Sequence, residues 1–213
     1  MLDRLPPEIL HAILVLTYPP SPWPDQDGVD KKRRRTLTKL CLVFKAVGKR
    51  AQLLLWRKLR LRLVKTIEKA TRLVKHRTPL VQAVRTIRLV NGDALEKTLP
   101  LIQACTGLRK VQLFGGWVSW RDLYGLDIRT LELLDIRVGL PADLEPSAVS
   151  RLTLQGVRMS KEAAMRFLQP ETFPNLRVLT FGLFSTPEND EYFPYVDPGL
   201  ANQVDTVQLN TSA

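Results

Sequence analysis

The sequence predicts an α/β protein in which a short helical module precedes a repeat domain with a parallel β-sheet. Two observations lead to this fold class. Apolar residues recur at helical spacing in the first part of the chain, and a different apolar pattern then recurs six times between residues 84 and 209. We therefore divide the chain into a helical module at residues 1–62, a linking helix at 63–83 and a repeat domain at 84–213.

The charge is unevenly distributed along the 213 residues. Residues 1–90 carry 21 Lys and Arg against 6 Asp and Glu, whereas residues 91–213 carry 11 against 15. A basic first half attracts an acidic protein, nucleic acid or a membrane surface. The two cysteines, Cys41 and Cys105, both lie in apolar periodic segments, so we expect buried thiols rather than a disulfide.

The helical module begins with a helix that Asp3 can cap and whose first turn holds Pro6 and Pro7. The helical pattern stops in a Pro-rich and basic insert at 18–35. The end of this insert, Lys31–Arg35, is a nuclear-import signal, a phosphate-binding patch or a solvated first turn of the next helix. Helical spacing returns from residue 37, breaks near Gly48 and resumes from residue 51.

Three segments of this module resemble an F-box: Leu5-Pro6-x-Glu8-Ile9-Leu10, Leu40-Cys41-Leu42-Val43 and Leu53-Leu54-Leu55-Trp56. The insert at 18–35 departs from that family, because F-boxes usually join their first two helical segments tightly. The resemblance implies a three-helix unit that docks on the Skp adaptor of cullin-RING ubiquitin ligases. It also implies that the adaptor interface, or the core that supports it, contains Leu5, Pro6, Ile9, Leu10, Ile13, Leu40, Leu42 and Val43. Trp56 is expected to brace the module's own core.

The repeat domain is defined by an aliphatic residue, two further residues, an aliphatic residue, one residue, and an aliphatic residue or Phe. The six units are Val84/Ile87/Leu89, Leu108/Val111/Leu113, Ile128/Leu131/Leu133, Val149/Leu152/Leu154, Leu176/Leu179/Phe181 and Val204/Val207/Leu209. Before these units, Leu59, Leu61 and Leu63 alternate with Arg60 and Arg62, which suggests a brief strand or an extended exit from the module. These units resemble irregular leucine-rich repeats, which implies a solenoid with a parallel sheet.

The residue between the last two apolar positions faces the opposite side of each strand, because side chains alternate along a strand. In all six units it is polar: Arg88, Gln112, Glu132, Thr153, Thr180 and Gln208. We therefore expect a sheet with one buried face and one open face. We predict target-binding residues on the open face at Arg88, Gln112, Phe114, Glu132, Thr153 and Thr180.

Between the repeats, helices are predicted over Leu95–Ile102 and after Ser160, a short helix over residues 119–126, and a long loop at the open face over 185–202. Four aromatic residues of the loops are candidate anchors for a target: Trp117, Trp120, Tyr192 and Tyr195. For the two tryptophans we favour the alternative, which is packing between repeats. Gly115-Gly116 is expected to form a turn after a strand.

The motif inventory contains no zinc ligand spacing, no phosphate-binding glycine loop and no nucleophile motif, so we predict a protein without catalytic activity or cofactor. The N-terminus lacks a signal-peptide pattern and no apolar run approaches the roughly 20 residues of a membrane span. We expect an intracellular protein, in the cytoplasm or nucleus, without membrane contact.

Together with the F-box resemblance, these features predict a substrate-recognition adaptor of an SCF-type ubiquitin ligase. Its partners would be a Skp-type adaptor, through it a cullin, and an unknown target protein. The alternative is a leucine-rich-repeat scaffold outside the ubiquitin system that binds nucleic acid or an acidic partner through its basic N-terminal half.

Overall fold

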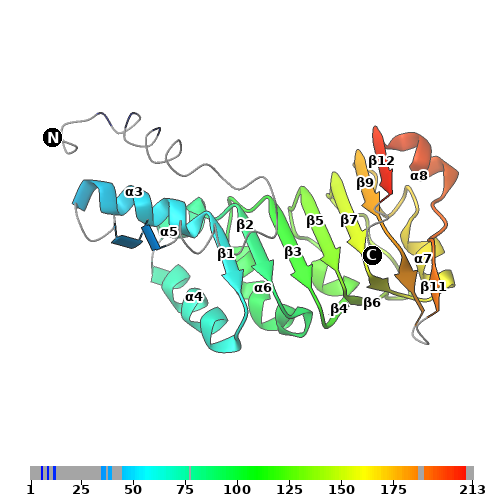
Figure 1. Cartoon of the computed structure of the whole chain (residues 1–213), viewed down its shortest axis with the longest axis horizontal. Coiled ribbons are helices and arrows are strands. Elements are labelled where there is room, and N and C mark those ends of the chain that lie inside the picture. The colour runs from blue at the N-terminus through cyan, green and yellow to red at the C-terminus, as the bar shows by residue number, and fades with distance from the viewer. Residues whose placement is uncertain are drawn as a thin grey trace.

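The computed structural model of the chain describes residues 6, 9, 12, 35, 36, 38, 39, 45–76, 78–186 and 190–209. This part forms an α/β protein with a parallel seven-stranded sheet, whose order is β1-β2-β3-β5-β7-β9-β12. The strands are β1 (Lys58–Leu61), β2 (Thr86–Leu89), β3 (Lys110–Phe114), β5 (Thr130–Leu134), β7 (Arg151–Gln155), β9 (Val178–Phe181) and β12 (Thr206–Leu209). All six predicted strands are present and run parallel to one another, each beside the next one along the chain (Figure 1).

The main sheet begins earlier in the chain than the repeat domain that we assigned to residues 84–213. Strand β1 falls within the predicted helical module, yet its Leu59 and Leu61 pair in register with Ile87 and Leu89 of β2. Both leucines are buried, because their alternation with Arg60 presents them to the same apolar layer as the later repeats. The segment from residue 58 onward is therefore continuous with the main sheet.

A second sheet has the order β11-β10-β8-β6-β4 and was not predicted. Its strands are β4 (Trp117–Ser119), β6 (Arg137–Gly139), β8 (Val157–Arg158), β10 (Phe184–Ser185) and β11 (Glu191–Tyr192). Strands β4, β6, β8 and β10 are parallel, and β11 pairs antiparallel to β10. With two or three residues each, these strands are too short to produce a periodic sequence signal.

Left-handed residues form the corners between the two sheets. Gly115 and Gly116 (φ 68° and 78°) join β3 to β4, Asp135 (φ 49°) joins β5 to β6, and Gly156 (φ 60°) joins β7 to β8. Glycine adopts this region freely, and Asp is one of the few other residues that tolerate it. The predicted turn at Gly115-Gly116 is confirmed, and the same device recurs at the two following corners.

Six helices have both of their ends in the described part: α3 (Lys45–Trp56), α4 (Val64–His76), α5 (Thr78–Ala83), α6 (Leu95–Ala104), α7 (Lys161–Phe167) and α8 (Pro198–Gln203). Two short 3-10 helices cover Gly92–Ala94 and Trp120–Leu123. Helix α3 continues through Gly48, so the predicted break there is wrong. The linker at 63–83 holds two helices, α4 and α5, rather than one.

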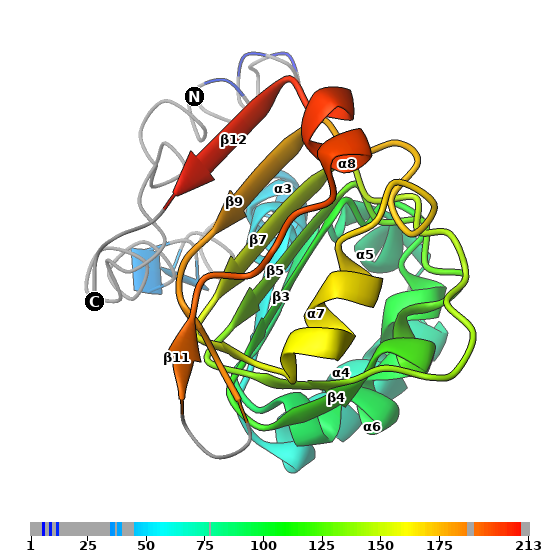
Figure 2. The same ribbon diagram turned by 90° about the vertical axis from the view of Figure 1, so that its right-hand side faces the viewer.

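Helices α4, α6 and α7 lie on one side of the main sheet (Figure 2). The helices predicted over Leu95–Ile102 and after Ser160 are confirmed as α6 and α7. Ser160 caps α7, its Oγ accepting a hydrogen bond of 3.2 Å from the Ala163 backbone N–H. Thus the buried face of the sheet lies toward these helices.

The long loop predicted over 185–202 is wrong in part, because this segment contributes to β10 and contains β11 and α8. Helix α8 has a start signal that the sequence reading missed. The Asp197 side chain accepts a hydrogen bond of 2.7 Å from the Gly199 N–H, and Pro198 occupies the first turn, where its missing N–H costs nothing. Strands β10 and β11 extend the second sheet rather than lying across the open face of the main sheet.

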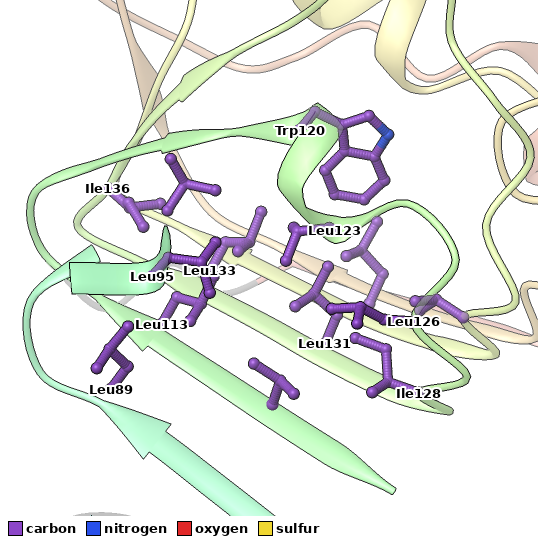
Figure 3. Packing of buried hydrophobic residues seen from close by; sticks show 14 of the residues in the cluster. Leu89, Leu95, Leu113, Trp120, Leu123, Leu126, Ile128, Leu131, Leu133 and Ile136 are labelled. Atoms are coloured by element: carbon purple, nitrogen blue, oxygen red, sulfur yellow. The ribbon is translucent and has the colours of Figure 1, made fainter. Parts of the chain in front are cut away.

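The apolar core follows the inner face of the main sheet. Leu89, Leu113 and Leu133 of adjacent strands lie beside one another, with Leu95 of α6 and Ile136 after β5 packed near them (Figure 3). Each of these five residues is at most 1% exposed. Trp56 is half-buried and packs against this same core, rather than against a core confined to the predicted module.

Candidate functional site

The polar residue of each main-sheet strand lies in one column across the open face. Pairwise register connects Arg60 to Arg88, Gln112, Glu132, Thr153, Thr180 and Gln208 in that order. Five of the six predicted target-binding residues belong to this column. The sixth, Phe114, is half-buried two residues beyond Gln112 and pairs with Leu134. The predicted polar column is thus confirmed as a geometric feature, and its role in binding stays a prediction.

The middle of the column is held by a local polar network. The Glu132 carboxylate accepts a hydrogen bond from the Gln112 side-chain amide and forms an ion pair with Lys110 on the neighbouring strand. Gln112 is 4% exposed, and the side chain of Glu132 is 17% exposed. Because these groups are partly shielded from water, their orientation is fixed more firmly than that of an exposed pair. Glu132 therefore has its charge engaged inside the protein.

The C-terminal end of the column is more open. Thr180 donates a hydrogen bond of 3.3 Å from its hydroxyl to the Gln208 side-chain oxygen. All four residues of β12 are exposed, including Val207 at 46% and Leu209 at 59%, although both stand at positions that are buried in the preceding strands. The open face consequently passes from a half-buried centre to a fully exposed last strand.

A second candidate site lies on the outside of the short sheet. A hollow of about 330 Å³ is lined by Asp93, Gly116, Trp117, Asp135, Arg137 and Arg158. Trp117, Arg137 and Arg158 are adjacent in register on β4, β6 and β8. The Oδ1 atom of Asp93 accepts a hydrogen bond of 2.6 Å from the Trp117 backbone N–H, and this bond holds the corner at Gly116 in place. We did not predict this site, although Trp117, Arg137 and Arg158 recur at the same spacing as the main strands.

The close approach of Gly156 to Asp135 at the corner between β7 and β8 can be tested by substitution. We expect Gly156→Ala to lower the free energy of unfolding by about 2 kcal/mol, because a Cβ at φ 60° is strained and would also clash with the Asp135 carboxylate. Urea denaturation would measure the change. Gly125→Ala is the matched control. Gly125 has φ 69°, but the Cβ of an alanine there would meet no other atom within 4 Å, so only the backbone strain of about 1 kcal/mol is expected. Equal losses for both variants would contradict the close packing at Gly156.

The four aromatic residues that we considered as anchors fall into two groups. Trp117 is 50% exposed and Tyr195 is 55% exposed, so both are available to a partner. Trp120 is 1% exposed and Tyr192 is half-buried, with its hydroxyl donating a hydrogen bond of 2.8 Å to the Met159 carbonyl. Trp120 thus has the packing role that we favoured for the tryptophans, and Tyr192, an anchor candidate, is largely engaged inside the protein.

Two titratable groups are shifted by burial in a direction that lowers their reactivity. Burial raises the pKa of the Cys105 thiol to about 11, so the thiolate is scarce at neutral pH. Cys105 is the buried free thiol that we predicted, whereas Cys41 lies outside the described residues. Burial and the nearby Glu162 carboxylate raise the pKa of Tyr192 to about 12. These groups act as neutral packing residues.

Most residues of the predicted adaptor interface lie outside the described part of the chain. Leu5, Leu10, Ile13, Leu40, Leu42 and Val43 are among these. Of the remaining two, Pro6 is exposed and Ile9 is 49% exposed. Within the basic run at the end of the insert, Arg35 is described and is exposed on a helix. The adaptor interface therefore stays a prediction from sequence.

Among the described residues, no three His, Cys, Asp or Glu side chains gather closely enough to share a metal ion. Every helix in that same part of the chain is too short or too polar to cross a lipid bilayer. Comparison of the chain with known protein families, with curated proteins and with solved structures finds no match in any of the three.

Proposed function

We propose that this chain is a non-catalytic recognition subunit of an SCF-type ubiquitin ligase. In this proposal the open face of the main sheet holds a target protein, and the N-terminal segment docks on a Skp-type adaptor. The observation that supports a recognition role is the in-register polar column that crosses all seven main strands opposite an apolar face. A long, regular surface of this kind suits the binding of another macromolecule.

The repeated geometry of the chain supports an irregular leucine-rich-repeat solenoid as the scaffold. Each step from β3 to β9 consists of a main strand, a left-handed corner or short turn, and a strand of the second sheet. Neighbouring steps pair in both sheets, so the chain advances by one strand spacing per unit. In such an arrangement the open face grows with the number of units and is independent of any single loop.

The contribution of this subunit would be proximity rather than bond chemistry. A target held on the open face and an adaptor held at the N-terminus would be kept within one particle, which raises the effective concentration of the target near the ligase. The other subunits would carry out the transfer of ubiquitin. The F-box resemblance of residues 3–61 is the support for the adaptor half of the proposal.

Binding to a purified Skp adaptor tests this proposal. We expect the full chain to be retained by the immobilised adaptor, and the variant Leu5→Ala/Pro6→Ala/Ile9→Ala to bind about tenfold more weakly, because apolar anchors at an interface carry most of its affinity. The control variant Met165→Ala/Leu183→Ala removes exposed apolar side chains from elsewhere and should bind like the wild type. A folded wild-type chain that does not bind the adaptor would rule out this function.

A further inference from the structure

A row of arginines follows one edge of the main sheet. Arg57, Arg85, Arg109, Arg129 and Arg177 each stand one residue before a main-sheet strand. We call this row the arginine edge. Its members are aligned by backbone hydrogen bonds: the Arg85 N–H donates to the Arg57 carbonyl at 2.9 Å, the Arg109 N–H to the Arg85 carbonyl at 3.0 Å, and the Arg129 N–H to the Arg109 carbonyl at 3.1 Å. The Cα atoms of Arg57, Arg85, Arg109 and Arg129 are therefore stacked at the spacing of adjacent strands, and Arg177 follows two strands further on, after Ser150.

The arginine side chains differ in how far the protein already uses them. Arg85 is held by its own surroundings, since its Nη1 donates to the Gln82 carbonyl at 2.6 Å and to the Gly107 carbonyl at 2.9 Å. By contrast, Arg109 and Arg129 are exposed, as is Arg151 at the start of β7. None of these three side chains has a hydrogen bond or ion pair with another described residue. They lie on three consecutive strands and are available to a ligand.

Basic residues also occupy first and third positions of the main strands, directly after the arginine edge along the chain. We compare three positions at each main strand: the residue before the strand, the first residue of the strand and its third residue. The basic members of this set are Arg57, Lys58, Arg60, Arg85, Arg88, Arg109, Lys110, Arg129, Arg151 and Arg177, and the acidic members are Glu132 and Asp205. Both acids already lie beside a base: Glu132 pairs with Lys110, and Asp205 lies 3.5 Å from Arg177. Arg109, Arg129 and Arg151, which no described acidic residue pairs with, therefore make the centre of this region positive.

The same residues indicate which anion fits. None of them is aromatic, and Phe114, the aromatic residue further along the same face of β3, is half-buried, so the surface offers little on which the bases of single-stranded nucleic acid can stack. Thr153, Thr180 and Gln208 instead provide hydroxyl and amide groups that can bond to a peptide backbone. Guanidinium groups bind carboxylates through two parallel hydrogen bonds. Charge and hydrogen-bonding groups thus favour an acidic polypeptide over a polynucleotide.

We propose that the arginine edge and the adjoining open face bind an extended acidic segment of a target polypeptide. The five strand spacings from Arg57 to Arg177 span about 24 Å, which an extended peptide of about seven or eight residues would cover. Arg109, Arg129 and Arg151 are its central contacts. This inference rests on the proposed function only in taking the ligand to be a target protein.

Fluorescence anisotropy with a labelled oligo-glutamate peptide of about eight residues tests the inference on the full chain. We expect saturable binding, and the variant Arg109→Glu/Arg129→Glu/Arg151→Glu should lose about tenfold or more in affinity, because three attractive pairs become repulsive. The control variant Arg72→Glu/Lys97→Glu/Arg121→Glu changes the net charge equally, using exposed basic residues of α4, α6 and the 3-10 helix at Trp120–Leu123, and should lose no more than about twofold. Thermal unfolding by circular dichroism would verify that both variants fold.

Three results would overturn the inference: no binding of the oligo-glutamate peptide, equal losses in the two triple variants, or tighter binding of a single-stranded oligonucleotide with the same number of charges. The variant Arg109→Lys/Arg129→Lys/Arg151→Lys keeps the charge and the fold but loses the bidentate geometry, and we expect an intermediate affinity. Adaptor binding separates the two proposals. Loss of adaptor binding with peptide binding intact would count against the ligase function alone, whereas the reverse would count against the acidic ligand alone.

Discussion

Replacing Phe167 by alanine is expected to lower the free energy of unfolding by about 4 kcal/mol. Phe167 is completely buried at the end of α7 and makes edge-to-face contacts with Trp120 (ring centroids 4.6 Å apart) and Phe173 (5.1 Å apart). Trp120 and Phe173 also contact each other, at 5.7 Å. The substitution removes one member of a closed aromatic cluster and leaves a cavity that three separate segments of the chain enclose.

Urea denaturation followed by tryptophan fluorescence is a suitable measurement, because the ring of Trp120 is part of the cluster. Met165→Ala is the matched control. Met165 is on the same helix but is 49% exposed, so its loss should change the free energy of unfolding by no more than about 0.5 kcal/mol. A change below about 1 kcal/mol for Phe167→Ala would contradict the packing described for this cluster.

A second large effect is expected at Leu133, for which Leu209 offers a comparison within the same chain. Both stand at the last apolar position of the repeat pattern, in β5 and β12. Leu133 is fully buried between Leu113 and Leu154, whereas Leu209 is 59% exposed. We expect Leu133→Ala to cost about 3 kcal/mol, because it removes buried apolar surface and creates a cavity.

Leu209→Ala, in contrast, should cost less than about 0.5 kcal/mol, since it removes surface that is already in water. Equilibrium unfolding of the two variants under identical conditions compares sequence-equivalent positions that differ mainly in burial. If Leu209→Ala proved as costly as Leu133→Ala, then the last strand would be covered in solution by something other than the described residues.

The main sheet was predictable because each strand carries its own signal. Alternation of two apolar residues around a polar one identified six strands, and the recurrence of that pattern predicted the parallel order and the polar column from Arg88 to Gln208. The brief strand suggested at Leu59 and Leu61 is the first strand of the same sheet. Buried alternation repeated at intervals is a strong signal, because a shift by one residue would move every side chain to the wrong face.

The second sheet and helix α8 were missed for physical reasons. Strands of two or three residues, such as Val157–Arg158, have no period to detect, and α8 depends on a single capping residue, Asp197. The sequence could not show which of the loop tryptophans packs inside, because the neighbours that enclose Trp120, Phe167 and Phe173, are distant in sequence. Partners so far apart along the chain leave no mark in local sequence.

From the sequence we compared the net charge of the two halves of the chain, whereas the structure brings basic residues from both halves together at the main sheet. By sequence halves, the second half is slightly acidic, yet it supplies Arg109, Lys110, Arg129, Arg151 and Arg177 to one surface. A usable signal was present, because Arg85, Arg109, Arg129 and Arg177 each follow the first apolar residue of their repeat. Aligning the repeats by their apolar positions and comparing the remaining positions would have revealed the row.

The pairing of each main strand only with the strands before and after it in the chain also bears on how the molecule opens. Strand β12 can detach without breaking any hydrogen bond between β1 and β7, whereas freeing β5 requires the rupture of two ladders. Amide hydrogens of the central strands should therefore exchange with solvent most slowly, and those of the last strand should exchange early through local fraying. Unzipping from one end, rather than a single all-or-none melting event, is the behaviour that this architecture favours.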